Sequence, residues 1–352
     1  MTPSAFGNPA RYYADTEHYP PKTPGLFDHS HTESTIRRAL DRFDTTIQKS
    51  VERTVKRWNQ SLRDQIRLET GLRLGGGDER HSVSIRVVDG LPKSLASVFD
   101  QFTNPVFWDL LLNKTVLKTT LTGLGILQRD LGEILSWPEA EGLTTSEQDI
   151  QSTGRVVSKV VEWLEALEVA ENLKKIDEDI LGAYFFHKGL IQIYWMPIGV
   201  IARMLNISVE RLTIVVLTHE LVHAYTHLGS DIDSEQWATG AFAEADLKIV
   251  EGMAQFYTFV VCAKLEGREP GMSKAFDALL SIQSPAYTDF KKWTTPNERA
   301  GEIVRFSMIG CRMKKLKKYE AFLEELKKVR ERVGRGEPEQ IGFHLNRRSL
   351  PY

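Results

Sequence analysis

The chain has 352 residues, of which 41% are hydrophobic and 26% charged, a balance that excludes an intrinsically disordered or membrane-embedded protein. Its formal net charge of −2 gives no overall argument for a nucleic-acid or membrane partner. Two cysteines exclude a disulfide scaffold, no apolar run reaches the roughly 18 residues of a membrane span, and the N-terminus has no apolar secretory segment, so we expect a soluble cytoplasmic protein.

The N-terminal part of the chain divides into a tail and a helix. Residues 1–30 are rich in Pro, Gly, Tyr and His without periodicity, which predicts a flexible tail. Over residues 32–74 apolar side chains recur at steps of three and four, which predicts one long amphipathic helix, assigned as the unit 31–75. Gly75-Gly76-Gly77 then predicts a linker. This helix is basic and offers a possible partner or dimer contact, although packing within the chain is the simpler interpretation.

The remainder, residues 80–335, is expected to form one catalytic domain, followed by a C-terminal tail at 336–352. Alternation predicts a strand at 82–88, and two β-rich runs around a Gly-containing turn predict a hairpin at 183–195. Helical patterns cover the following segments: 94–136, 147–178, 198–205, 209–228, 242–265, 271–282 and 298–333. We therefore expect an α+β fold, predominantly α, with long flanking helices around a small antiparallel or mixed sheet of about three strands.

The helix predicted at 209–228 carries the strongest chemical signal, the motif His219-Glu220-Leu221-Val222-His223. Ser208 is a plausible N-cap for it. One helical turn brings the imidazoles of His219 and His223 to the same face, where both can bind one metal ion. Glu220 can then take a proton from a water in the metal's open position and deliver it to a leaving group. This H-E-x-x-H arrangement predicts one Zn²⁺ ion and a hydrolytic reaction.

A third metal ligand is required, and the sequence distinguishes the candidates. The metzincin pattern needs a glycine where this chain has Thr226 and a histidine where it has Gly229, so that class is excluded. Glu251 is the best candidate, because it lies on the next predicted helix beside the small residues Gly252 and Ala254, which allow close helix packing. Other acidic residues remain as alternatives: Glu244, Asp246, Asp231 and Asp233.

The motif H-E-L-V-H followed by Glu251-Gly252-Met253-Ala254 resembles the gluzincins, zinc metallopeptidases whose third ligand is a glutamate from a second helix. The resemblance covers residues 150–265 and implies a zincin-like metallopeptidase core. It also implies that an edge strand before the active-site helix binds the substrate backbone, and residues 190–195 are placed to be that strand. The interval between His223 and Glu251 is longer than in the thermolysin-type pattern, to which Glu244 lies nearer.

A tyrosine or histidine often stabilises the oxyanion in this family, and Tyr257, six residues after Glu251, is the residue we assign. The other options are these: Tyr225, His187 and Tyr287. His227 continues the histidine row but has rotated about 80° around the helix from His219, so we interpret it as a structural residue.

The sequence therefore predicts a zinc metallopeptidase acting on a peptide or protein. Two alternatives remain: a hydrolase of non-peptide amides, and a non-catalytic zinc-fold protein with a regulatory or partner-binding role. An intact Glu220 disfavours the second, because a structural zinc site needs a fourth ligand and not a base. Residues 201–212 resemble a helix-turn-helix, but its second helix continues into the apolar metal motif instead of forming an exposed recognition helix. We expect no nucleic-acid or membrane partner.

Overall fold

The computed structural model describes these parts of the chain: residues 30–74, 83–92, 114–136, 147–165, 180–231, 235–295 and 298–335, with a few single positions between 92 and 180. The Gly75-Gly76-Gly77 linker and the expected tails lie outside the described residues, except that Ser30 begins the first helix. The described part is mostly helical with one three-stranded sheet, so the expected α+β, predominantly α class is confirmed.

The single long N-terminal helix that we expected is wrong, because two helices, α2 (Ser30–Phe43) and α3 (Ile47–Thr70), stand in its place. The break lies at Asp44, whose carboxylate accepts hydrogen bonds from the backbone N–H of Thr46 at 2.8 Å and from its hydroxyl at 2.6 Å. Such local side-chain bonds compete with the helical ladder. Gly71 ends α3 in the left-handed conformation, with φ of 72°.

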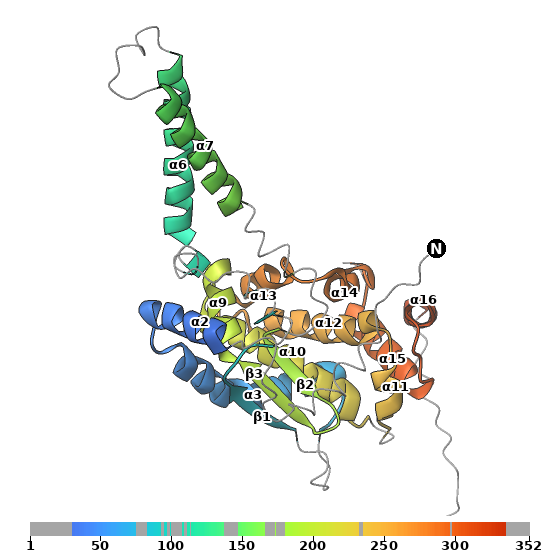
Figure 1. Ribbon diagram of the computed structural model, residues 1–352. Helices are drawn as coiled ribbons and strands as arrows, with labels where there is room; N and C mark the ends of the chain where they lie inside the picture. Colours follow the sequence, from blue (N-terminus) through green and yellow to red (C-terminus); the bar gives the residue numbers. More distant parts are fainter. Residues whose placement is uncertain are drawn as a thin grey trace, which may run out of the picture.

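Helix α10 (Val209–Leu228) forms the centre of the molecule, which explains why its sequence is apolar on nearly every side. It packs between α3 and α12 (Leu247–Leu265), with the sheet against it as well (Figure 1). The apolar stripe of α3 is buried in this core: Val51, Val55, Trp58, Leu62 and Ile66. The expected intramolecular packing of α3 is therefore confirmed, while a partner contact through its exposed basic face stays a prediction.

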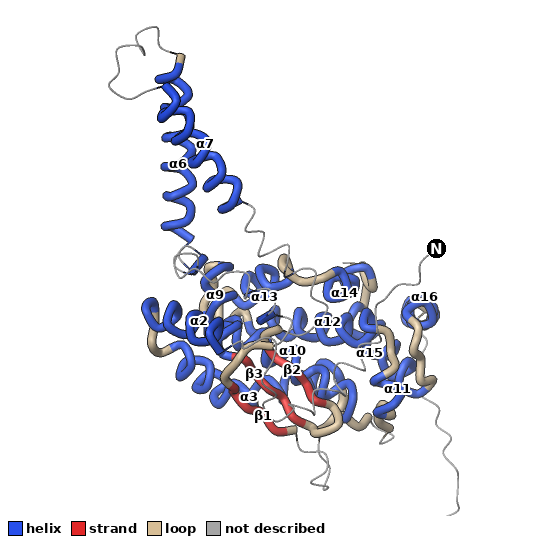
Figure 2. Tube along the Cα trace, in the orientation of Figure 1, coloured by secondary structure: helices blue, strands red, loops and turns tan. Residues whose placement is uncertain are grey.

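The sheet consists of β1 (Ser84–Val88), β2 (Gly182–Phe185) and β3 (Leu190–Tyr194), in the order β1-β3-β2 (Figure 2). β1 pairs with β3 in parallel and β2 pairs with β3 in antiparallel orientation, so the expected hairpin and mixed sheet are confirmed. The expectation that residues 190–195 form an edge strand is wrong. β1 occupies the second side of β3, and β2 is the edge strand nearer α10.

Two helices, α6 (Lys114–Leu135) and α7 (Glu147–Glu165), pack together as a pair that projects from the rest of the molecule (Figure 1). They correspond to the helical patterns expected before and after residue 137. α9 (Trp195–Leu205) follows β3 directly and leads through a turn at Asn206 into α10. None of the helices in the described part of the chain combines the length and hydropathy of a membrane span.

The C-terminal helices are more interrupted than their sequence pattern predicts. The helix expected from residue 242 is divided into α11 (Thr239–Ala243) and α12, because the Asp246 side chain accepts from the Lys248 backbone N–H at 2.9 Å and caps a new helix. The remaining helices follow in chain order: α13 (Met272–Leu280), α14 (Pro285–Thr288), η3 (Asp289–Lys292), α15 (Ala300–Met313) and α16 (Tyr319–Gly334). The last two replace the single helix expected at 298–333.

Gly252 of α12 packs against the indole of Trp293, and not against α10 as we expected from its sequence. A Cβ atom at Gly252 would lie 2.4–2.5 Å from two carbons of that ring. Trp293 is buried, so its ring has little room to move. We expect Gly252→Ala to lower the free energy of unfolding by about 1–3 kcal/mol, measured by urea denaturation.

The matched control is Gly301→Ala near the start of α15, where an added Cβ meets no atom within 4 Å. It should be neutral or slightly stabilising, since alanine favours the helix. A Gly252→Ala protein as stable as the parent would contradict the assigned packing of Trp293.

Candidate metal centre

Helix α10 begins at Val209 and ends at Leu228, the boundaries that the sequence predicts. The expected N-cap is confirmed, because the Ser208 hydroxyl oxygen accepts from the Arg211 backbone N–H at 3.2 Å. His219, Glu220 and His223 are all buried, with exposed fractions of 6%, 1% and 3%.

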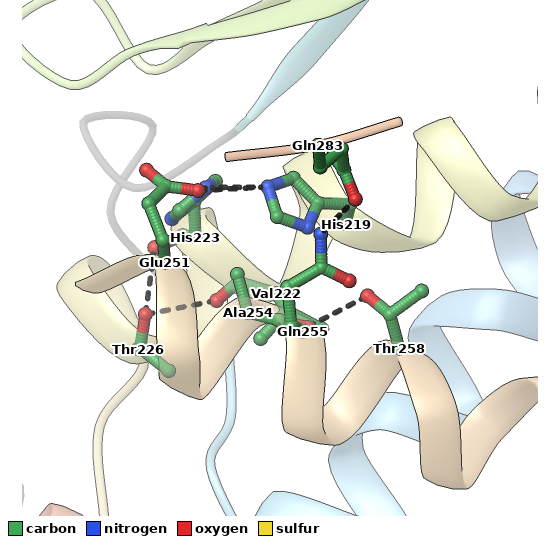
Figure 3. A network of polar contacts seen from close by, with 9 residues as sticks. All are labelled: His219, Val222, His223, Thr226, Glu251, Ala254, Gln255, Thr258 and Gln283. Atoms are coloured by element: carbon green, nitrogen blue, oxygen red, sulfur yellow. Dashed lines mark hydrogen bonds and ion pairs between the residues drawn. The ribbon is translucent and has the colours of Figure 1, made fainter. Parts of the chain in front are cut away.

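Glu251 of α12 meets the two histidines of α10 at one point (Figure 3). His219 Nε2 lies 3.0 Å from His223 Nε2 and 3.1 Å from Glu251 Oε2, and His223 Nε2 lies 3.4 Å from that same oxygen. Ligands about 2.0–2.2 Å from a tetrahedral ion lie about 3.3–3.6 Å from one another. The three atoms therefore fit one shared metal ion after small side-chain adjustments.

The charges of this group also favour a cation. Burial would raise the pKa of the Glu251 carboxyl, but the facing imidazoles of His223 and His219 outweigh burial and hold that pKa below its usual range. Glu251 is 1% exposed, so its carboxylate depends on these two rings for compensation. A buried carboxylate facing two imidazole nitrogens requires a positive charge among them, either a proton or a metal ion.

The structure places the alternative acidic residues elsewhere. Glu244 is exposed and forms an ion pair with a lysine near the start of α16. Asp246 caps α12, and Asp231 accepts from the backbone N–H four residues later. Asp233 lies outside the described residues. Among the residues that the structure describes, Glu251 is the candidate that joins the two histidines.

Glu220 lies next to the candidate metal ligand His219 and against Gly182 of the edge strand β2. A Cβ atom at Gly182 of β2 would lie 2.8 Å from both Cγ and Oε1 of Glu220. The absence of a side chain at Gly182 therefore allows the edge strand to lie against the Glu220 carboxylate. Glu220 and His219 also line a cavity of about 40 Å³ that opens beside them.

The structure brings Tyr287, and not Tyr257, to the metal-ligand group. The Tyr287 ring, on α14, stacks against His219 with 5.9 Å between centroids and lines the same cavity. Tyr257 is buried on another side of α12, where burial raises the pKa of its phenol and the charges of Arg305, Glu69 and Arg312 act on it.

The other two options also lie elsewhere: the Tyr225 hydroxyl donates to the Arg63 carbonyl, and His187 is exposed in the β2–β3 turn.

His227 holds the edge strand on α10 instead of binding metal with His219 and His223. Its Nδ1 lies 3.0 Å from the Tyr184 hydroxyl of β2, and its Nε2 lies 3.1 Å from the Thr239 hydroxyl of α11. The exposed fraction of His227 is 1%. The interpretation of His227 as a structural residue agrees with these contacts.

The pKa of His227 is lowered from 6.5 to about 3, first by burial and then by the nearby charges of His187 and Arg312. Below pH 6.5 the His227 imidazole is protonated in the unfolded chain but stays neutral in the folded chain. The stabilisation that the neutral, buried imidazole provides at neutral pH is therefore lost progressively as pH falls toward 3. We expect the wild-type protein to lose about 2 kcal/mol more unfolding free energy between pH 7 and pH 5 than His227→Gln.

Urea denaturation at both pH values, with a chelator present so that metal release does not contribute, measures this difference. His31→Gln, which removes an exposed histidine of α2, is the control and should follow the wild-type protein. A His227→Gln protein with the pH dependence of the wild type would contradict the burial assigned to this imidazole.

Sequence reasoning missed two side chains close to the site, Gln255 and Gln283. Gln255 lies one turn after Glu251 on α12, so helical periodicity could have placed it near the ligands. Gln283 follows α13, and nothing in the sequence pattern brings it there; it lines the cavity beside His219.

Comparisons of the chain with protein-family models, with curated proteins and with solved structures gave no match.

Proposed function

We propose that this protein is a zinc-dependent hydrolase of the gluzincin type and that it cleaves a peptide bond in a peptide or protein. The observation that carries the proposal is the convergence of His219 Nε2, His223 Nε2 and Glu251 Oε2 within 3.4 Å of one another, next to Glu220. Two buried cysteines without a disulfide, Cys262 and Cys311, fit the reducing cytoplasm as its compartment.

The ligand set supports zinc in a catalytic site. Two imidazoles and one carboxylate hold catalytic zinc in known peptidases and leave one position open, whereas structural zinc sites have four protein ligands. Within the described residues, the group contains three candidate ligands and no fourth His, Cys, Asp or Glu. A site with an open position and a neighbouring carboxylate suits hydrolysis better than a purely structural role.

A bound zinc ion supplies Lewis-acid chemistry, lowering the pKa of water and polarising a carbonyl group. Glu220, buried beside His219, accepts the proton of the attacking water and later delivers it to the leaving amine. Tyr287 replaces Tyr257 as the candidate for donating a hydrogen bond to the developing oxyanion, because its ring stacks on His219.

The edge strand supports a peptide as the substrate. One side of β2 pairs with β3, and no strand among the described residues pairs with its other side. An extended peptide can add to such an edge through main-chain hydrogen bonds. Gly182 brings this strand against Glu220, so a peptide bound there would pass close to the proposed base.

Metal analysis combined with a cleavage assay tests the proposal. The purified protein should contain one zinc ion per chain and should cleave members of a mixed peptide library, with cleavage stopped by a zinc chelator and restored by added zinc. A protein that binds no zinc would refute the proposal. Bound zinc without hydrolysis of any peptide would favour the non-catalytic alternative.

A further inference from the structure

The side chains that line the cavity beside His219 and Glu220 differ from those expected of a general solvent-filled cleft. Its walls are mainly aliphatic, with Val216 of α10, Leu181 before β2, and Leu279 and Ile282 around the end of α13. Its volume of about 40 Å³ leaves room for about three water-sized groups. A small group that enters it therefore lies next to the proposed metal ligands and is surrounded by apolar side chains.

Two glutamine side chains also line this cavity, in addition to His219, Glu220 and Tyr287. Gln255 comes from α12, one turn after Glu251, and its Nε2 donates to Gln283 Oε1 at 3.0 Å (Figure 3). Gln255 is only 2% exposed, so its side chain lies in the interior of the protein. Within the described residues, neither side-chain amide makes another hydrogen bond.

Each amide has one carbonyl oxygen and one amino group, and the single bond between them uses one of each. The pair therefore retains the carbonyl oxygen of Gln255 and the amino group of Gln283. A carboxamide is the matching chemical group, because it donates to a carbonyl with its amino group and accepts from an amino group with its oxygen.

We propose that this cavity is the specificity pocket for a substrate side chain ending in a carboxamide, Asn or Gln, next to the cleaved bond, with Gln255 and Gln283 as the recognising residues. This inference rests on the proposed peptidase function. The methylene groups of the side chain pack on the aliphatic walls while its carboxamide pairs with the two glutamines.

Other side chains fit this pocket less well. An aliphatic side chain of similar size leaves the carbonyl and amino groups of the glutamine pair without partners in an apolar cavity, which is how polar pockets reject apolar analogues. A substrate carboxylate would leave the Gln255 carbonyl oxygen facing a second acceptor. It would also place its negative charge beside the negative charge of Glu220. We therefore expect selection against both Leu and Asp relative to Asn.

A peptide library followed by single-residue peptide series tests the proposal on the zinc-loaded, full-length protein. Mass spectrometry of the cleaved library should show Asn or Gln enriched at one fixed position relative to the cleaved bond. In matched peptides, kcat/KM should be at least about tenfold higher with Asn than with Leu or Asp at that position.

Substitution of the pair supplies the second arm. Gln283→Glu keeps the shape but replaces the free amino group with an acceptor, so the preference should move from Asn and Gln to Lys. Gln128→Glu changes an exposed glutamine of α6 and should leave the preference unchanged. Zinc content and circular dichroism establish that each variant is folded, and Gln255→Leu provides a second variant with an expected loss of the Asn preference.

The outcomes separate the pocket from the catalytic function. If no library peptide is cleaved by the zinc-loaded protein, the peptidase proposal fails and the pocket assignment fails with it. If peptides are cleaved without a preference for Asn or Gln, or if that preference survives unchanged in both Gln283→Glu and Gln255→Leu, the pocket assignment alone is overturned.

Discussion

Replacing Glu220 by glutamine is expected to lower the turnover of a cleaved peptide by about 10²–10⁴-fold, while the protein keeps its zinc. Glutamine has nearly the same shape but cannot accept the proton of the attacking water. Glu220 is not one of the three convergent side chains, so the substitution leaves the proposed metal ligands unchanged.

The measurement combines steady-state turnover with zinc content determined on the same preparation. Glu244→Gln is the matched control, because Glu244 is an exposed glutamate in the turn between α11 and α12 and its ion pair is with a surface lysine. It should keep full activity. A Glu220→Gln protein with parental turnover would show that this carboxylate is not the base.

Replacing Glu251 by glutamine is expected to weaken zinc binding by more than about 100-fold and to abolish hydrolysis at limiting zinc. Changes to groups that only support the ligands cost about 10–100-fold in metal affinity, and the loss of a ligand carboxylate should exceed that range. The buried imidazoles of His219 and His223 would also lose the negative charge that faces them. Competition with a chromophoric chelator measures the affinity.

Glu244→Gln again serves as the control, and here it also tests the rival ligand assignment. If Glu244→Gln loses zinc and Glu251→Gln retains it, the third ligand is misassigned. If both variants bind zinc as tightly as the parent, then the ion binds elsewhere.

The features of the candidate site's geometry that were predicted correctly from the sequence depend on local spacing. A capping serine and an apolar run define α10, and a four-residue interval on a helix brings His219 and His223 together. Glu251 required one further inference, that the next helix packs on α10, and both helices are apolar enough to make that the expected contact.

The features that sequence reasoning missed depend on contacts between distant segments. Whether Tyr257 or Tyr287 reaches the site depends on how α12 and α14 are oriented, and periodicity within either helix does not define that orientation. The same limit explains why β3 was wrongly expected to be the edge strand. Its sequence predicts one strand of a hairpin, and only the pairing with the distant β1 makes it the central strand. Asp44 is a residue type that can break a helix through local hydrogen bonds. The apolar stripe continues from one side of Asp44 to the other, however, and this continuity favoured a single helix.

The sheet topology also has a consequence for the order in which the site assembles. β2 and β3 pair across a short turn, whereas β1 pairs with β3 from Ser84 to Leu190, across a loop of on the order of 100 residues. Closing that loop costs about 3 kcal/mol more chain entropy than closing the turn. The hairpin carrying Gly182 should therefore form early, and β1 should join late, after pairing of α6 with α7 has shortened the intervening chain.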